Sequence, residues 1–279
     1  HEEDGSIITE QNLGKIKESL NSSTLWTVRA HRGLNTPETV VLAGKLGADL
    51  TKINIVYGSL NAGTDPGRLT VDGVEAIKLA AKYNLPFDEP TNEELGGVPA
   101  YKAFAGMLIV AKLGLKLGAK PILKPLFCYS PDVMITGRMD DNYIDYNAAK
   151  IYALRSIIDA PIWPGEPIGF MTHSEDRIQS SMTTALHAAL ATSLGVDAIT
   201  IASSDEAYSR GSISVTSRID TLRAVQEAFR FLGKAEIRPT HRAIEWSNEL
   251  VSQIEKVLEN VLRKGSFVAA LYNGILGSK

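Results

Sequence analysis

Short apolar runs that end in polar or charged residues alternate along this chain with longer amphipathic stretches. Short apolar runs are typical of buried strands, and spacings of three and four between apolar residues are typical of helices. Strand–helix pairs that repeat every roughly 30 to 40 residues indicate parallel strands with helical crossovers. The predicted strands are Leu25–Arg29, Ile53–Tyr57, Leu85–Phe87, Pro121–Phe127, Pro167–Met171 and Asp197–Ala202. The helices that follow them begin at Thr36 or span Val71–Tyr83, Pro99–Leu117, Tyr143–Ile158, Arg177–Leu194 and Val215–Leu232.

This alternation predicts an α/β fold of the TIM (β/α)8 barrel type, with incomplete or irregular ends. A closed barrel needs two more strands, and the tail offers a helix at Glu245–Arg263 followed by the apolar run Phe267–Tyr272. We expect residues 1–22 to form an N-terminal leader with a helix at Thr9–Leu20, and residues 23–279 to form one barrel domain within a natural chain that could be longer. The rival is an open doubly wound sheet, but neither the G-x-G-x-x-G nor the P-loop fingerprint supports it.

Composition narrows the class of protein. The net charge of −3 over 279 residues gives no reason to expect nucleic-acid binding, which normally requires a basic surface. The single cysteine, Cys128, excludes an intrachain disulfide framework and a thiolate zinc site, so a cytoplasmic protein is expected. Apolar runs are too short to span a membrane, and the acidic start His1–Asp4 is unlike a targeting peptide.

Polar side chains follow several of the predicted strands, where barrel enzymes place their chemistry. Arg29, His31 and Arg32 follow the first strand, and guanidinium groups there can grip a carboxylate or phosphate through paired hydrogen bonds. We interpret this segment as an anion clamp. A strand-end ion pair and a loop histidine are the alternative.

Two further strand ends carry candidate catalytic groups. Asp88 and Glu89 follow Leu85–Phe87 and could bind an ammonium group, hold a metal or exchange protons, although alternation along a strand admits only one of them to a site. His173 ends an apolar run and could act as an acid, a base or a hydrogen-bond donor. The residues after it are explained equally well by a helix cap.

The run after Asp197–Ala202 offers Ser204, Glu206 and Tyr208, which suit sugar or alcohol hydroxyls, with a solvated turn as the alternative. No residues have metal-ligand spacing, so no metal is predicted. The G-x-S-x-G motif of serine hydrolases does not occur either.

The order of these landmarks resembles the large catalytic subunit of glutamate mutase, a coenzyme B12-dependent carbon-skeleton mutase. The resemblance rests on Arg29, Ile55–Tyr57, Asp88–Pro90 and Ser180–Leu232, is clearest over Thr183–Ala207, and extends weakly over residues 20–272. It implies a TIM barrel and radical chemistry with adenosylcobalamin. The chain lacks the D-x-H-x-x-G cobalamin-ligand motif, so a small partner subunit would hold the cofactor.

Residue by residue, the resemblance implies that Arg29 clamps a substrate carboxylate, Tyr57 contacts the substrate and Glu206 contacts the adenosyl ribose. The chain departs from the family at four positions, which are Thr51 for a glutamate, Asn61 for a tyrosine, Asp88 for an arginine and Ala202 for a lysine. Since Asp88 reverses the charge of a carboxylate-gripping arginine, we expect a small carboxylate or amino-acid substrate other than glutamate, with an ammonium or hydroxyl group at the Asp88 end.

The leading hypothesis is therefore a subunit of an adenosylcobalamin-dependent isomerase of amino-acid metabolism that forms homo-oligomers. A second hypothesis is a cobalamin-independent barrel lyase, aldolase or decarboxylase that uses either Lys124, a lysine in an apolar strand that could form an imine, or a metal held by carboxylates. A third is a barrel subunit that has lost its catalytic site. Requirement for a small cobalamin-binding partner would favour the first.

Overall fold

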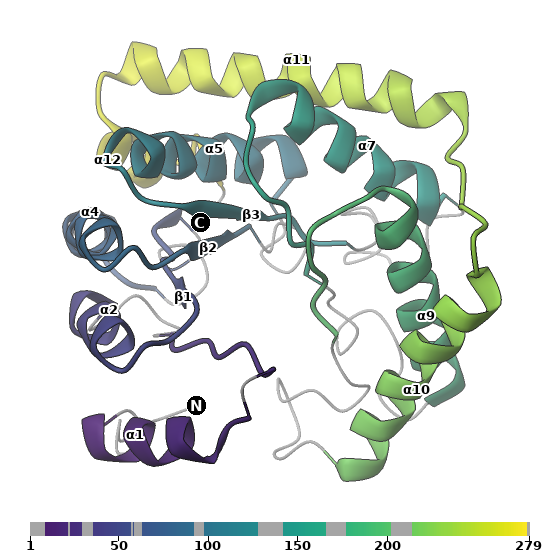
Figure 1. The fold of residues 1–279 in the computed structure, drawn as a ribbon. Coiled ribbons are helices and arrows are strands. Elements are labelled where there is room, and N and C mark those ends of the chain that lie inside the picture. The colour runs from purple at the N-terminus through teal and green to yellow at the C-terminus, as the bar shows by residue number, and fades with distance from the viewer. Residues whose placement is uncertain are drawn as a thin grey trace.

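The computed structural model describes residues 9–21, 23–29, 36–56, 58, 63–91, 98–127, 142–165, 177–201 and 214–277. Helices predominate in this part of the chain, and the strands are short (Figure 1). The helices are α1 (Glu10–Ser19), α2 (Thr36–Lys45), α4 (Pro66–Lys82), α5 (Ala100–Lys116), α7 (Tyr143–Ile157), α9 (Arg177–Ser193), α10 (Val215–Leu232), α11 (His241–Lys264) and α12 (Phe267–Tyr272). The strands are β1 (Thr51–Lys52), β2 (Phe87–Pro90) and β3 (Pro121–Lys124).

The three strands form a parallel sheet in the order β1-β2-β3. In its register Lys52 pairs with Asp88, and Asp88 pairs with Ile122. Single parallel bridges continue the pairing on both sides, at Thr27↔Leu50 and at Leu123↔Ile162. Neighbouring strands in the sequence are thus neighbours in the sheet, as helical crossovers require.

The predicted TIM barrel is wrong. Among the described residues only three strands form, each two to four residues long, and the apolar run Phe267–Tyr272 is helix α12 rather than a closing strand. A barrel requires eight mutually staggered strands. The predicted strand Leu25–Arg29 contains one isolated bridge, at Thr27. The described residues of the predicted strand Asp197–Ala202 form no strand.

Helix existence was predicted well, and the errors lie at the ends. The leader helix, predicted over Thr9–Leu20, is α1, whose Thr9 hydroxyl accepts a hydrogen bond from the Asn12 backbone. The helix predicted at Val71–Tyr83 begins five residues earlier, because the Asp65 carboxylate caps it and a proline follows. None of the helices in the described ranges is both long and apolar enough to cross a membrane.

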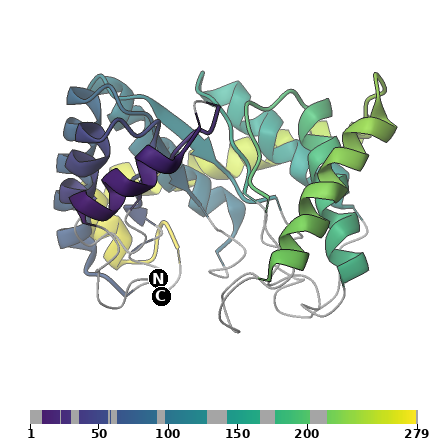
Figure 2. The same ribbon diagram turned by 60° about the horizontal axis from the view of Figure 1, so that its bottom comes forward.

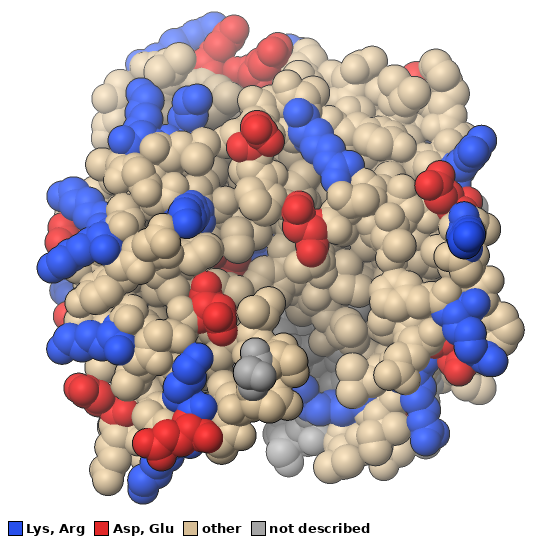
Figure 3. Space-filling model, in the orientation of Figure 1, with Lys and Arg blue, Asp and Glu red and all other residues tan. Residues whose placement is uncertain are grey.

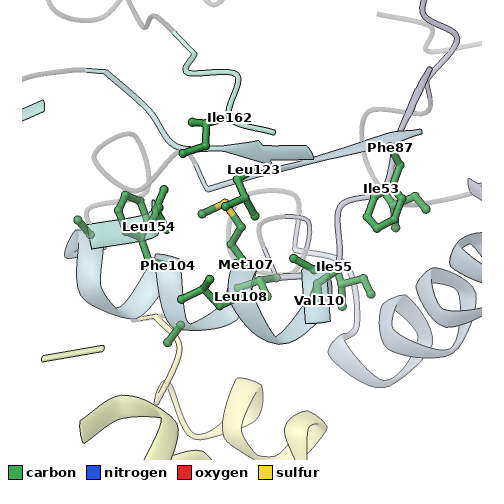
Figure 4. Packing of buried hydrophobic residues seen from close by; sticks show 14 of the residues in the cluster. Ile53, Ile55, Phe87, Phe104, Met107, Leu108, Val110, Leu123, Leu154 and Ile162 are labelled. Atoms are coloured by element: carbon green, nitrogen blue, oxygen red, sulfur yellow. The ribbon is translucent and has the colours of Figure 1, made fainter. Parts of the chain in front are cut away.

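One face of the sheet packs on α5. Leu123 and Ile162 point from the sheet toward Met107 of that helix, as Figure 4 shows, and all three side chains are buried. Phe87 on β2 contacts the same helix at Gly114, where the absence of a side chain allows close approach. This apolar layer fixes which side chains of each strand point away from α5, since successive residues alternate between faces.

The remaining helices surround this layer. Helix α11 crosses α5 and α7, whereas α9 and α10 lie side by side on the opposite side of the molecule from α2 and α4 (Figures 1 and 2). The start of α11 is tied to α7, because Thr240 donates hydrogen bonds from its backbone (2.6 Å) and hydroxyl (2.5 Å) to the Asp145 carboxylate. Leu13 of α1 joins the main core, so the leader helix packs on the rest of the chain.

Replacing Gly44 by alanine is expected to destabilise the fold by about 1–3 kcal/mol. A Cβ atom at Gly44 in α2 would lie 2.3 Å from Cγ of Tyr83, at the base of an aromatic ring that follows α4, so the two helices would have to separate. Gly14 in α1 is the matched control, because a Cβ atom there meets nothing within 4 Å. Gly14→Ala should stabilise by up to about 1 kcal/mol through helix propensity alone. Urea unfolding measures both, and equal effects would contradict the packing.

Candidate functional site

A row of charged side chains occupies the sheet face opposite α5. Lys52 and Asp88 are register partners in β1 and β2, and therefore point to the same side. Lys124 lies two residues after Ile122, the β3 partner of Asp88, and so shares that side. Thr27 pairs with Leu50, and Arg29 and Lys52 each lie two residues further along their segments. Arg29 therefore shares the face of Lys52. We call Arg29, Lys52 and Lys124, which surround Asp88, the basic cluster.

Asp88 is the anion at the centre of the basic cluster. Its carboxylate is fully buried, with one oxygen 3.3 Å from the Arg29 guanidinium and the other 3.5 Å from the Lys124 ammonium. These distances exceed the roughly 2.7–2.9 Å of strong charge-assisted hydrogen bonds. Neither oxygen has a hydrogen-bond partner among the described residues. The carboxylate is therefore held by charge rather than by close hydrogen bonding.

Lys52 is buried, with 5 % of its surface exposed. Burial is the main cause that lowers the pKa of its ammonium to about 8; Asp88 raises this pKa, and Arg29 and Lys124 lower it. Its amine is therefore mostly charged at pH 7 but loses its proton under mildly alkaline conditions.

Glu89 is a second buried carboxyl group; it follows Asp88 in β2 and pairs with Leu123, so its side chain lies on the opposite face of the sheet from the basic cluster. Burial raises its pKa well above the ordinary 4.5, although the backbone of Ile55, the charge on Lys52 and the backbone of Val56 all lower it. The negative charge of Asp88 raises it further. Glu89 is thus held toward its neutral, proton-bearing form, in which it can donate a hydrogen bond.

Substituting Glu89 by glutamine is expected to stabilise the protein at pH 8 and to have little effect at pH 4. A raised folded-state pKa means that the folded chain keeps a proton which the unfolded chain loses above 4.5, so stability falls as pH rises beyond that value. Glutamine resembles the neutral carboxyl and removes this loss. Urea unfolding at both pH values measures it, and a stability difference that is the same at both would refute the assignment.

Trp163 completes the wall of the site. The Lys124 ammonium lies 4.1 Å from the centre of its ring, and the Arg29 guanidinium lies 6.0 Å from it, both within cation–π range. The indole nitrogen is buried and has no hydrogen-bond partner among the described residues. An unpaired buried donor is costly, and an acceptor oxygen entering the site would satisfy it.

Positive charge is therefore concentrated inside the molecule. Among the described residues, the cluster gathers three basic side chains around one carboxylate, whereas acidic and basic side chains are interspersed on the outer face shown in Figure 3. A buried excess of like charge attracts an anion of complementary size. Among the described residues, no group of three or more His, Cys, Asp or Glu side chains is placed to hold a metal.

A separate cavity of about 290 Å³ lies on the helical side of the molecule, between α5, α7 and α11. Its walls include the rings of Tyr146 and Trp246, which meet edge to face. Lys150 lines it too, and its ammonium donates a 2.7 Å hydrogen bond to the Leu126 carbonyl. This cavity is mostly apolar, and none of the residues of the basic cluster lines it.

The structure brings together three of the residues singled out in the sequence, namely Arg29, Asp88 and Lys124. Glu89 is buried on the opposite face of the sheet. The other candidates lie outside the described residues; these are His31, Arg32, Tyr57, His173, Ser204, Glu206 and Tyr208. Asn61 and Ala202 also lie outside them, whereas Thr51 is buried and its hydroxyl donates to the Val28 carbonyl.

Sequence reasoning missed Lys52 and Trp163. The second strand was predicted at Ile53–Tyr57, whereas β1 is Thr51–Lys52, so Lys52 was placed before the strand rather than at its end. Trp163 was missed because it precedes the fifth predicted strand, Pro167–Met171, which lies outside the described residues, whereas pairing with β3 already involves Ile162. Two features of the sequence could have drawn attention to them: Lys52 directly precedes the apolar run that begins at Ile53, and Trp163 lies in the sequence Pro161-Ile-Trp-Pro164.

In comparisons with known proteins, no family model and no curated protein matches this chain.

Proposed function

We propose that this chain binds a small carboxylate substrate at the basic cluster and serves as the substrate-binding component of an adenosylcobalamin-dependent mutase. The observation that carries the carboxylate assignment is the row of three basic side chains, Arg29, Lys52 and Lys124, which lie around Asp88 on one sheet face. The mutase assignment rests on the sequence resemblance that is clearest over Thr183–Ala207.

Electrostatics explains why the ligand would be an anion. Two opposite unit charges 4 Å apart attract by about 4 kcal/mol at an effective dielectric constant of 20. A carboxylate placed against the exposed part of the Arg29 guanidinium would gain up to that attraction. Phosphate would also satisfy the charge, and the binding experiment below includes it as a competitor.

Arg29 is the residue placed to receive the carboxylate. Its side chain is 30 % exposed, whereas the Lys124 side chain is 11 % exposed and Asp88 is fully buried. A guanidinium has five N–H donors, and one of its nitrogens faces Asp88. The remaining donors suit the planar, two-oxygen geometry of a carboxylate. The unpaired indole N–H of Trp163 adds a further donor on the same side.

In this proposal Asp88 organises the cluster rather than holding the far end of the substrate. Both of its oxygens already face cations, so an incoming ammonium group would compete with Arg29 and Lys124. This differs from the role expected from the sequence, in which Asp88 receives the polar end opposite the carboxylate. The substrate's other end would then contact groups outside the cluster.

The cofactor part of the proposal is supported by the sequence. The residues that the resemblance assigns to the adenosyl ribose, including Glu206, lie outside the described residues. When bound, adenosylcobalamin would supply the radical that starts the rearrangement. The chain itself would orient the substrate through its carboxylate and keep water away from it, with the apolar layer against α5 giving the cluster a rigid base.

Isothermal titration calorimetry with propionate, propionamide and inorganic phosphate tests the carboxylate assignment. We expect propionate to bind and its uncharged isostere propionamide not to bind. Arg29→Met should weaken propionate binding by about 10- to 150-fold, the value of a hydrogen bond to a charged group. Arg230→Met, which removes an exposed arginine on α10, is the control and should bind normally. Equal affinity for acid and amide, or tighter binding of phosphate, would contradict the proposal.

The mutase assignment needs a separate experiment. The chain is mixed with adenosylcobalamin and a small protein carrying the D-x-H-x-x-G motif, and carboxylic and amino acids are added in turn. We expect a substrate-dependent change in cobalamin absorbance together with a radical signal in electron paramagnetic resonance. If propionate binds but no acid gives either signal, the carboxylate site stands and the mutase assignment fails.

A further inference from the structure

We infer that Lys52 is a nucleophilic amine that forms an imine with a 2-oxo acid whose carboxylate is held by Arg29. This inference rests on the proposed carboxylate site and narrows its substrate class to acids with a carbonyl group beside the carboxylate. It also moves the imine-forming role from Lys124, which the sequence suggested, to a lysine that the sequence did not single out.

The position of Lys52 in the row carries the argument. Lys52 lies between Arg29 on one side and Asp88 on the other, on the same sheet face as both. Neighbouring strands are about 4.8 Å apart, so an acid gripped by Arg29 presents its adjacent carbon to the next strand, where Lys52 projects. A 2-oxo acid carries its carbonyl on that carbon.

The surroundings of Lys52 favour a reactive amine. A lysine becomes nucleophilic when burial and neighbouring cations disfavour its charged form. Lys52 has both, since it is buried and Arg29 and Lys124 lie around it, and its pKa of about 8 leaves about a tenth of it as the free amine at pH 7. The two remaining cations keep their charge to hold the carboxylate and to polarise the carbonyl.

Lys124 is less suited to the role. Its ammonium lies 3.5 Å from the Asp88 carboxylate and 4.1 Å from the centre of the Trp163 ring. An anion and an aromatic face both stabilise the protonated form of an amine, in which the nitrogen has no lone pair to attack a carbonyl. Lys124 therefore acts as a fixed positive charge beside the reacting lysine.

The step balances without any added oxidant or reductant. The Lys52 nitrogen donates its lone pair to the carbonyl carbon, the C–N bond forms, and the carbonyl oxygen takes up a proton. The nitrogen then loses its protons, the C–O bond breaks and the oxygen leaves as water, which gives the C=N bond. The two protons that the nitrogen loses balance the two that the oxygen takes up, so the step needs no further proton donor.

Reductive trapping tests the inference. The chain is incubated with pyruvate and sodium cyanoborohydride at pH 7.5, and the peptides are mapped by mass spectrometry. We expect a mass increase corresponding to one reduced pyruvate adduct on Lys52. Lys52→Arg should lose this adduct, whereas Lys124→Arg should retain it. Lys150, a buried lysine on α7 outside the cluster, reports unspecific labelling.

The outcomes separate this inference from the function on which it rests. An adduct on Lys124, or labelling of Lys150 to the same extent as Lys52, overturns the assignment to Lys52. If pyruvate and propionate bind with similar affinity and no lysine is trapped, the carboxylate site stands and the imine does not. Should neither acid bind, the proposed function itself fails.

Discussion

Asp88→Asn is expected to lower the free energy of unfolding by about 3–5 kcal/mol at pH 7, the cost of removing one partner from a buried ion pair. The substitution preserves the shape of the side chain but removes the negative charge that faces the Arg29 guanidinium and the Lys124 ammonium and that raises the pKa of Lys52. The loss should be greater at pH 6 than at pH 9, because Lys52 is neutral at the higher pH and no longer adds to the repulsion. Urea unfolding at both pH values measures the effect.

Glu227→Gln is the matched control for Asp88→Asn. It removes a carboxylate that pairs with Arg230 on the surface of α10, where both side chains are more than half exposed. An exposed pair contributes little, so the change should stay within about 1 kcal/mol. A bound carboxylate should restore part of the stability lost in Asp88→Asn. A loss as small as that of the control would show that Asp88 does not neutralise the cluster.

Lys52→Met is expected to have the opposite effect, stabilising the chain by up to about 3 kcal/mol at pH 6. The folded-state pKa of Lys52 is depressed from 10.5 to about 8, so keeping this lysine charged inside the folded chain costs stability. Methionine has a similar volume and no charge. The same variant should lose the pyruvate adduct and bind propionate more weakly, because stability is gained at the expense of function.

The pH dependence identifies the cause of this gain. Below pH 8 both folded and unfolded chains carry the proton on Lys52, and the penalty is complete; between pH 8 and 10.5 only the unfolded chain carries it, so the penalty fades as pH rises. The stability advantage of Lys52→Met should therefore shrink between pH 8 and 10. A constant advantage across that range would mean that packing, rather than charge, is responsible.

Helices were predictable from the sequence because their signals are local. The apolar spacing of Val215–Leu232 and Ala100–Lys116 is sufficient to place these helices within a residue or so. Strands were less predictable, because a strand is defined by its pairing partner. Residues 53–56 have the more apolar sequence, yet pairing with β2 is made by Thr51 and Lys52. The barrel prediction was wrong for this reason, because it treated every short apolar run as a paired strand.

The site was partly predictable for the same reason. Arg29 and Asp88 stand at the ends of apolar runs, and that position alone brought them to attention. Their direct pairing could not be read from the sequence, because it depends on a register that crosses from the first segment through β1 to β2. The sequence therefore assigned Asp88 to an ammonium group of the substrate, whereas the cations that it faces belong to the chain itself.

A crystal structure of the chain grown with propionate tests the central claim most directly. We expect the propionate carboxylate at the basic cluster, with its oxygens within hydrogen-bond distance of the Arg29 guanidinium and of the Trp163 indole nitrogen. Asp88 should still lie between Arg29 and Lys124. A propionate bound only elsewhere, with the cluster closed around Asp88 alone, would contradict it.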